Sequence, residues 1–222
     1  GDELLIATLM TIFVSISAMT LGIIIAIFTA WSKISGRFIT KLIANFYTTV
    51  IRGVPELLVI YLIFFGGSAG VMYVAKIFGY QGYIELHPFT IGTIAIGLIS
   101  ATYSSEVFRG AYNVIDQGQV EAAKSLGLSK FKIFYKVLAP QILRHALPGL
   151  GNVWQITLKD TALISVTGLV EIMRQAKIGA GSTHSPFTFY IAAAILYIIL
   201  TSFSTKFFNK LEDVSNKSLS IS

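Results

Sequence analysis

Long apolar segments alternate with short polar ones along this chain, a pattern that predicts a bundle of membrane-spanning helices. A helix crosses a bilayer with roughly 17 to 25 mostly apolar residues. Five segments reach that length, at residues 4–31, 38–65, 88–105, 146–170 and 187–208. We therefore expect an all-α integral membrane protein with five transmembrane helices, organised as one domain over residues 1–222.

The composition supports this fold class. The chain is 54% hydrophobic and only 13% charged, whereas about 25% of the residues of a soluble domain are charged. It has no cysteine, which excludes disulfides, thiolate metal sites and cysteine nucleophiles. The net charge of +6 reflects basic residues near the span ends and does not indicate nucleic-acid binding. The first apolar segment is not expected to be a cleaved signal peptide, because it lacks a basic leader and is too long for a signal-peptide core. Because the initiator methionine is missing, we expect the chain as given to be trimmed or processed.

The distribution of lysine and arginine predicts the orientation, because cytoplasmic loops are enriched in both. With the N-terminus outside, twelve basic residues fall in inner segments and three in outer segments, namely Lys76, Arg174 and Lys177. The N-terminus is therefore expected outside and the C-terminus in the cytoplasm. The long polar connection at residues 106–145 is expected to be cytoplasmic, and residues 171–186 form a short polar loop on the outer side.

Within the cytoplasmic connection, the sequence predicts two short helices with a turn between them. Residues 119–126 favour a helix, and Gly127 can adopt the left-handed backbone that ends one. Ser129 can cap the next helix, and Pro140 marks its end or a kink. Apolar positions at i, i+3, i+4 and i+7 form a stripe in this second helix: Phe131, Phe134, Tyr135 and Leu138. Orientation requires lysines but no capped helix break, so the segment is predicted to be a docking surface.

Charged residues interrupt two of the predicted spans. In the second span they are Arg52 and Glu56, on either side of Pro55, which breaks helical hydrogen bonding. In the fourth they are Lys159 and Asp160, which face different surfaces because neighbouring residues on a helix diverge. Such groups usually face a bundle interior or an aqueous cavity. Two interpretations stay open: structural or snorkelling charges, or a substrate path formed by Arg52, Glu56, Asp160 and Thr161.

The remaining polar features are weaker signals. Glu106 and Arg109 are spaced for a local salt bridge. The glycine-rich residues 66–70 predict a flexible turn. The three histidines lack the spacing of metal ligands, and we expect them at loops and span ends, with no metal site. The sequence contains no arrangement of residues typical of an acid–base or metal-dependent active site.

Several of these segments resemble one family, the permeases of ATP-binding-cassette (ABC) importers. Glu121-Ala122-Ala123, followed by Gly127 and Pro140, is similar to their cytoplasmic EAA loop, although Ala139 replaces the leucine of that pattern. Residues 52–56, Arg-Gly-Val-Pro-Glu, resemble a signature of polar-amino-acid permeases, in the form of the histidine and opine branch. Residues 105–110 and 159–161 are also similar to family segments and follow in the expected order.

The resemblance implies a type I ABC importer transmembrane domain in the bacterial inner membrane, with a periplasmic N-terminus. The substrate would be a polar amino acid, in particular a basic one, or an opine. Coupling to the ATPase would fall to the EAA residues: Glu121, Ala122, Ala123, Lys124, Ser125, Leu126 and Gly127.

The resemblance also implies partners. They are a second permease subunit, two ABC ATPase subunits, an extracytoplasmic binding protein and membrane lipid. The second permease is expected to be a different chain rather than another copy of this one. No nucleic acid is expected. ATP and Mg would bind to the ATPase. No cofactor would bind to this chain, which has no GxxxxGK[ST] motif.

From the residues alone, two other classes stay open. An ATP-independent channel or secondary transporter would use the intramembrane charges as an ion path. An intramembrane enzyme would need an acid–base or metal constellation, which the sequence does not offer.

Overall fold

The computed structural model describes residues 2–34, 36–80, 82 and 86–217, and all the secondary structure in them is helical. The α-helices are α1 Asp2–Ile34, α2 Phe38–Gly53, α3 Glu56–Tyr61, α4 Gly67–Ile77, α5 Pro88–Asn113, α6 Gln117–Ser125, α7 Lys130–Ile133, α8 Ala139–Asp160, α9 Ile172–Thr183 and α10 Pro186–Lys217. Two π-helical turns, η1 Leu62–Gly66 and η2 Phe134–Leu138, and the 3₁₀ helix η3 Thr161–Thr167 join some of them.

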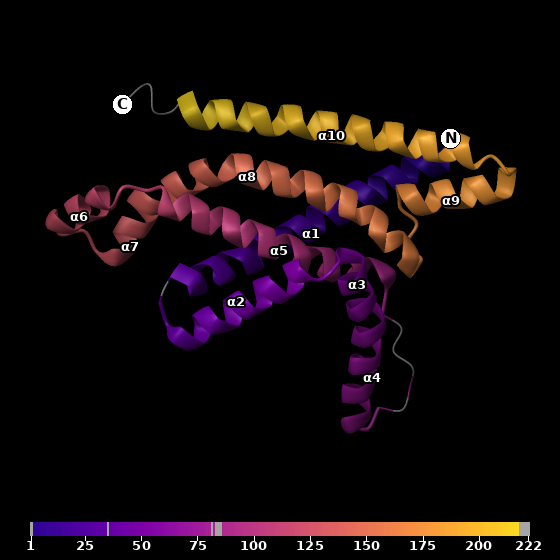
Figure 1. The fold of residues 1–222 in the computed structure, drawn as a ribbon, viewed down its shortest axis with the longest axis horizontal. Helices are drawn as coiled ribbons and strands as arrows, with labels where there is room; N and C mark the ends of the chain where they lie inside the picture. Colours follow the sequence, from indigo (N-terminus) through magenta and orange to yellow (C-terminus); the bar gives the residue numbers. More distant parts are fainter. Residues whose placement is uncertain (1, 35, 81, 83–85, 218–222) are drawn as a thin grey trace.

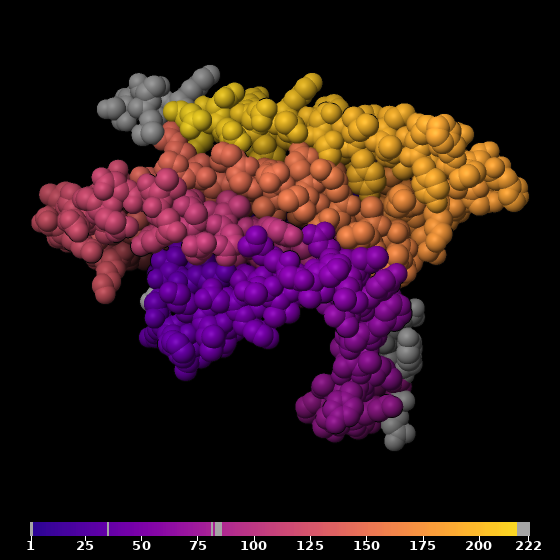
Figure 2. Space-filling model, in the orientation of Figure 1, coloured from indigo at the N-terminus to yellow at the C-terminus, as the bar shows by residue number. Residues whose placement is uncertain are grey.

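The long helices α1, α5, α8 and α10 lie along one another and form an elongated bundle (Figure 1). At one end α9 packs against α10, and at the other end α6 and α7 extend beyond the bundle. Helices α3 and α4 project away from it as an arm, and the space-filling view shows a hollow between this arm and α2 (Figure 2). The arm and the α6–α7 end are therefore the two parts with the least support from the rest of the chain.

Small residues bring α1 and α5 into close contact. A Cβ atom added to Gly22 would lie 2.1 Å from Ser100 Oγ and 3.1 Å from the carbonyl oxygen of Gly97. A Cβ on Gly97 would lie 3.2 Å from the carbonyl oxygen of Ala18. Membrane helices pack without help from the hydrophobic effect, so small residues that let backbones approach supply the contact energy.

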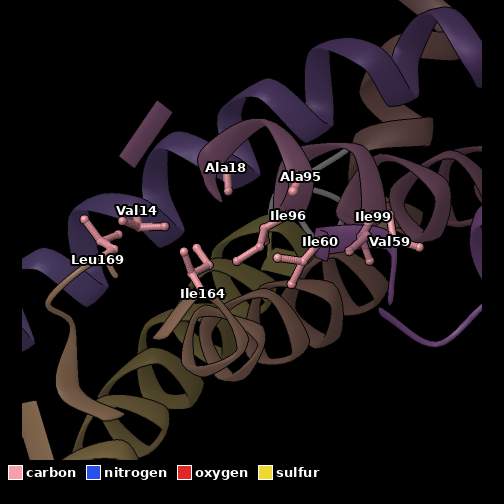
Figure 3. Close-up of a cluster of buried hydrophobic side chains, with 9 residues drawn as sticks. All are labelled: Val14, Ala18, Val59, Ile60, Ala95, Ile96, Ile99, Ile164 and Leu169. Atoms are coloured by element: carbon pink, nitrogen blue, oxygen red, sulfur yellow. The ribbon is translucent and has the colours of Figure 1, made fainter. Parts of the chain in front are cut away.

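Apolar side chains from several helices meet at the centre of the bundle. Figure 3 shows nine of them: Val14, Ala18, Val59, Ile60, Ala95, Ile96, Ile99, Ile164 and Leu169. A second buried cluster joins α1, α5 and α8 nearer the α6–α7 end, and a third joins α9 to α10. The first cluster includes residues of α3, so it anchors the base of the projecting arm.

Among the described residues, four helical segments are long and apolar enough to cross a membrane: α1, the continuous helix from Glu56 to Ile77, α5 and α10. The predicted spans 4–31, 88–105 and 187–208 lie within α1, α5 and α10, and α5 continues to Asn113. The fourth predicted segment, 146–170, comprises most of α8 together with η3, and it is not in this group.

The break that Pro55 predicts within the second span, 38–65, is confirmed, and the long apolar helix of this region runs from Glu56 to Ile77. Extended backbone at Val54 and Pro55, with ψ angles of 142° and 133°, separates α2 from α3. Proline lacks the N–H that would continue the helix and restricts the residue before it. The predicted turn at residues 66–70 is wrong, because these residues are helical. Glycine weakens a helix but removes no donor, so the apolar helix continues to Ile77.

We expect Gly22→Val to destabilise the bundle, because its side chain would overlap Ser100 and the backbone of α5. Overpacking costs about 1–3 kcal/mol, which lowers the melting temperature by roughly 2–10 °C. Thermal loss of the monodisperse peak of the detergent-solubilised protein measures this change. Gly110→Val is the matched control, since a Cβ there meets nothing within 4 Å. An equal effect of both substitutions would contradict close packing at Gly22.

Candidate functional site

Four polar side chains from four helices meet where α2 gives way to α3. Tyr103 Oη donates a hydrogen bond to Glu56 Oε1 at 3.0 Å. The Arg52 guanidinium carbon lies 5.4 Å from the centre of the Tyr103 ring, within the range of a cation–π contact. The Asp160 carboxyl group interacts with that of Glu56. We call Arg52, Glu56, Tyr103 and Asp160 the charged cluster.

The break at Pro55 creates this cluster. Arg52 stands in the last turn of α2 and Glu56 in the first turn of α3. Each charge therefore lies at the helix end whose dipole favours it, a cation at a C-terminus and an anion at an N-terminus. The backbone N–H groups of Leu58 and Val59 bond to the Pro55 carbonyl, at 2.9 and 3.2 Å, and restart the helix. An unbroken helix would separate the two side chains by one turn along a single face.

The charges in the cluster are unequal. It holds two carboxylates and one guanidinium, and Asp160 is only 9% exposed. Arg52 is exposed, and Glu56 and Tyr103 are half-buried. Two carboxylates in contact, one of them buried, favour a further cation. The arrangement can therefore bind a cationic group at Glu56 and Asp160, while Arg52 can pair with a carboxylate.

The structure brings together three of the four predicted path residues, but not Thr161. Thr161 is fully buried, donates to the carbonyl oxygen of Leu158 at 2.7 Å, and lies 3.4 Å from the hydroxyl of Tyr197. Lys159 is exposed while Asp160 is buried, which confirms that the two face different surfaces. The sequence reasoning missed Tyr103, because an aromatic residue within a span suggests only core or interfacial packing.

A buried carboxylate holds together the end of the bundle that carries α9, close to Thr161 and Tyr197. Glu171 is fully buried and accepts hydrogen bonds from the backbone N–H groups of Arg174 at 2.6 Å and Met173 at 2.8 Å. Tyr197 of α10 donates to the same carboxylate at 3.2 Å. The N–H of Ile172 also bonds to Thr11 of α1 at 3.2 Å. These contacts fix the start of α9 to α1 and α10.

Residues 171–186, predicted as a polar loop, thus contain the helix α9. The prediction failed because Glu171 caps this helix from its own N-cap position, a role more common for Ser, Thr, Asp or Asn. The glycines of the segment also weakened the helical signal.

The helix–turn–helix at the other end confirms the local sequence signals. Helix α6 starts after Asp116, whose carboxylate accepts the N–H of Gly118 at 2.9 Å. Gly127 adopts a φ of +72° after α6 ends, and Ser129 accepts the N–H of Lys132 at 3.4 Å. The segment therefore has a fixed geometry outside the bundle.

The side chains of this segment mostly face outward. Of the predicted coupling residues only Ala123 is buried; Glu121, Ala122, Lys124, Ser125, Leu126 and Gly127 are exposed. In the predicted apolar stripe, Phe131 is 75% and Tyr135 68% exposed, and their rings stack on each other. Ile133 is the residue that packs inward. Pro140 does not end the helix, because the π turn η2 widens it just before the proline and α8 continues.

Three charged side chains tie α1 and α5 together near the start of α2. Glu106 pairs with Arg109 at 2.7 Å, which confirms the predicted local salt bridge. Lys33 adds a second ion pair to Glu106 at 2.5 Å and donates to Thr48 of α2 at 2.6 Å. The sequence could not indicate Lys33 as a partner, because it lies far from Glu106 along the chain.

The described histidines lie at helix ends, as predicted, except one. His87 accepts the N–H of Phe89 and caps α5, and His184 ends α9 with a φ of 53°. His145 lies within α8. Within the described ranges, no three His, Cys, Asp or Glu residues group closely enough to hold a metal ion.

Comparison with known proteins gives consistent results. Residues 18–213 match the family described as "Binding-protein-dependent transport system inner membrane component". The nopaline transport system permease protein NocQ of Agrobacterium fabrum is 49% identical, covering 98% of this chain and 92% of the relative. The histidine/lysine/arginine/ornithine permease protein HisQ of Escherichia coli is 37% identical over 88% of this chain and 86% of its own. A crystal structure of an amino acid ABC transporter with histidines matches with a TM-score of 0.81 and 32% identity, covering 96% of this chain and 94% of that one.

We expect Glu171→Ala to loosen the start of α9 while the bundle stays folded. Loss of the cap costs about 1 kcal/mol, so the amides of Met173 and Arg174 should exchange with deuterium about fivefold faster. Hydrogen exchange followed by mass spectrometry measures this rate. Asp116→Ala is the control, because it removes the cap of α6 and should affect only the other end. Unchanged exchange at residues 173 and 174 would show that Glu171 does not hold α9.

Proposed function

The chain belongs to the family of binding-protein-dependent transport system inner membrane components, and we propose that it imports a polar amino acid, in particular a basic one, or an opine. Together with a second permease subunit it forms the path across the inner membrane. Relatives named for nopaline, octopine and histidine/lysine/arginine/ornithine transport support this substrate class. Membership of this family does not favour an ATP-independent channel or secondary transporter.

The charged cluster is the observation that carries the substrate assignment. Basic amino acids and opines bear carboxylates together with a cationic nitrogen group. Arg52 can pair with the substrate carboxylate, and Glu56 with Asp160 can accept the cationic group. These groups come from separate helices, so a movement of α3 relative to α8 would open the site and release the substrate. Thr161 serves the packing beside Tyr197 and does not contact the substrate.

The α6–α7 segment is the element that couples the chain to ATP hydrolysis. Exposed Glu121, Ala122 and Leu126, with the stacked rings of Phe131 and Tyr135, form a surface of fixed geometry. The assembled importer contains two ATPase subunits, which bind ATP and Mg, and one of them docks on this surface. Their closure moves the docked segment as a rigid body, and the continuous helix through η2 passes that movement to α8.

The proposed topology has five crossings with a periplasmic N-terminus and a cytoplasmic C-terminus. The crossings are α1, the region of α2 to α4, α5, α8 and α10. The second permease subunit covers the projecting arm, where Leu58, Leu62, Phe65, Tyr73, Val74 and Ile77 are exposed. We favour a related chain over a second copy for that subunit. An extracytoplasmic binding protein delivers the substrate at the α9 end.

We expect Asp160→Asn to lower arginine uptake at least tenfold, because a charge-assisted contact of about 1.5–3 kcal/mol is lost. Uptake is measured in proteoliposomes that contain the assembled importer, with ATP inside and the binding protein outside. Asp213→Asn, an exposed carboxylate near the end of α10, is the control. Uptake at the original rate in the Asp160 variant would remove this residue from the path.

We expect Gly127→Val to uncouple transport without blocking membrane insertion. A Cβ atom at Gly127 meets nothing within 4 Å, so the damage comes from backbone strain at its φ of +72°. Gly127→Asn is the matched control, because asparagine tolerates the left-handed region. The measurement is substrate-stimulated ATP hydrolysis by the assembled importer. Stimulation should fall in the valine variant and persist in the asparagine variant; full stimulation in both would contradict a coupling role for this turn.

A further inference from the structure

A basic cleft of about 350 Å³ opens between the end of α1, the start of α2 and the end of α5. Its polar lining consists of Lys33, Lys41, Asn45, Glu106, Arg109, Tyr112 and Asn113. The charged cluster lies elsewhere, at the far end of α2, so this cleft does not belong to the proposed substrate path. All the basic residues that line it lie on the proposed cytoplasmic side.

The charges that line this cleft do not cancel. Glu106 is shared between Lys33 and Arg109, so one carboxylate faces two cations. Lys41 adds a third cation, and no described carboxylate lies within ion-pair distance of it. The Lys33 side chain is only 7% exposed, so its charge is held in place by Glu106 and Thr48. The result is a preformed site with a surplus of two positive charges and two side-chain amides as further donors, which fits a phosphate group.

The surroundings of the cleft distinguish a lipid phosphate from a soluble one. Lys41 stands among the exposed apolar side chains of α2, which are Phe38, Ile39, Leu42, Ile43 and Phe46. A second, mainly apolar cleft of about 330 Å³ lies between α1 and α2, and Tyr47 and Leu98 are among the residues that line it. A soluble phosphate gains nothing from these groups, whereas acyl chains pack against them. Basic pockets between membrane helices on the cytoplasmic side suit anionic headgroups.

We propose that this cleft binds the headgroup phosphate of an anionic phospholipid of the cytoplasmic leaflet. The inference rests on the orientation given under the proposed function, but not on the substrate or the coupling mechanism. Lys41 and Arg109 contact the phosphate oxygens, and Lys33 fixes Glu106 so that it cannot repel the lipid. The bound lipid ties the start of α2 to the ends of α1 and α5. Because Arg52 stands in the last turn of α2, the lipid also steadies the helix that carries one side of the charged cluster.

The test is native mass spectrometry of the assembled importer, purified in mild detergent and titrated with phosphatidylglycerol or phosphatidylcholine. We expect Lys41→Gln to weaken phosphatidylglycerol binding about fivefold, since one basic contact with an anionic lipid is lost. Phosphatidylcholine binding should not change. Lys41→Arg should retain the preference, and Lys206→Gln, which removes an exposed cation from α10 on the same proposed side, should leave it intact.

Three results would overturn the proposal: equal binding of the two lipids to the unaltered complex, no effect of Lys41→Gln, or displacement of phosphatidylglycerol by inorganic phosphate. The last would identify a soluble anion as the ligand. The measurement requires no transport, so a failure of the proposed substrate assignment would not affect it. Conversely, active arginine uptake without lipid selectivity would overturn this inference alone.

Discussion

The extended backbone at Val54 and Pro55 determines where the charged groups of the membrane part meet. Backbone polar groups cannot bond to water in a bilayer, so a chain leaves the helix there only where protein or a cavity receives it. Here the break places Arg52 and Glu56 at facing helix ends, beside Tyr103 and Asp160. It also redirects the chain from α2 into the projecting arm. The direction of that arm and the composition of the cluster therefore depend on one proline.

The contacts around this break differ in strength along the bundle. Close packing at Gly22 and Gly97 makes α1 and α5 a rigid pair. The Ile172 N–H fixes α9 to α1, and Glu171 fixes it to α10. Within the described residues, the arm of α3 and α4 is anchored by contrast at its base, through Val59 and Ile60, and α4 has no buried residue. Movement is therefore expected between a firm body and the elements that carry Glu56. This division suits a site that must open and close, since interfaces between rigid parts switch between discrete arrangements.

The sequence predicted what depends on local chemistry and failed where distant contacts decide. Apolar length located α1, α5 and α10, and the Gly127 and Ser129 signals gave the turn between α6 and α7. The sequence indicated the break at Pro55, but the predicted span 38–65 included residues on both sides of that break. The glycines at 66–70 led to the wrong prediction of a turn, because apolar surroundings keep such residues helical. The partnership of Lys33 with Glu106, the role of Tyr103 and the burial of Thr161 depend on helix packing that no local pattern reveals.

The outward-facing rings of Phe131 and Tyr135 have a consequence for the life of the chain in the cell. Aromatic groups exposed to water on a folded segment are a liability for aggregation and for recognition by quality-control proteases. A newly inserted chain carries them uncovered until another protein buries them. We therefore expect the lifetime of the chain to depend on the supply of that partner, with surplus copies removed, so that subunit numbers balance without matched rates of synthesis.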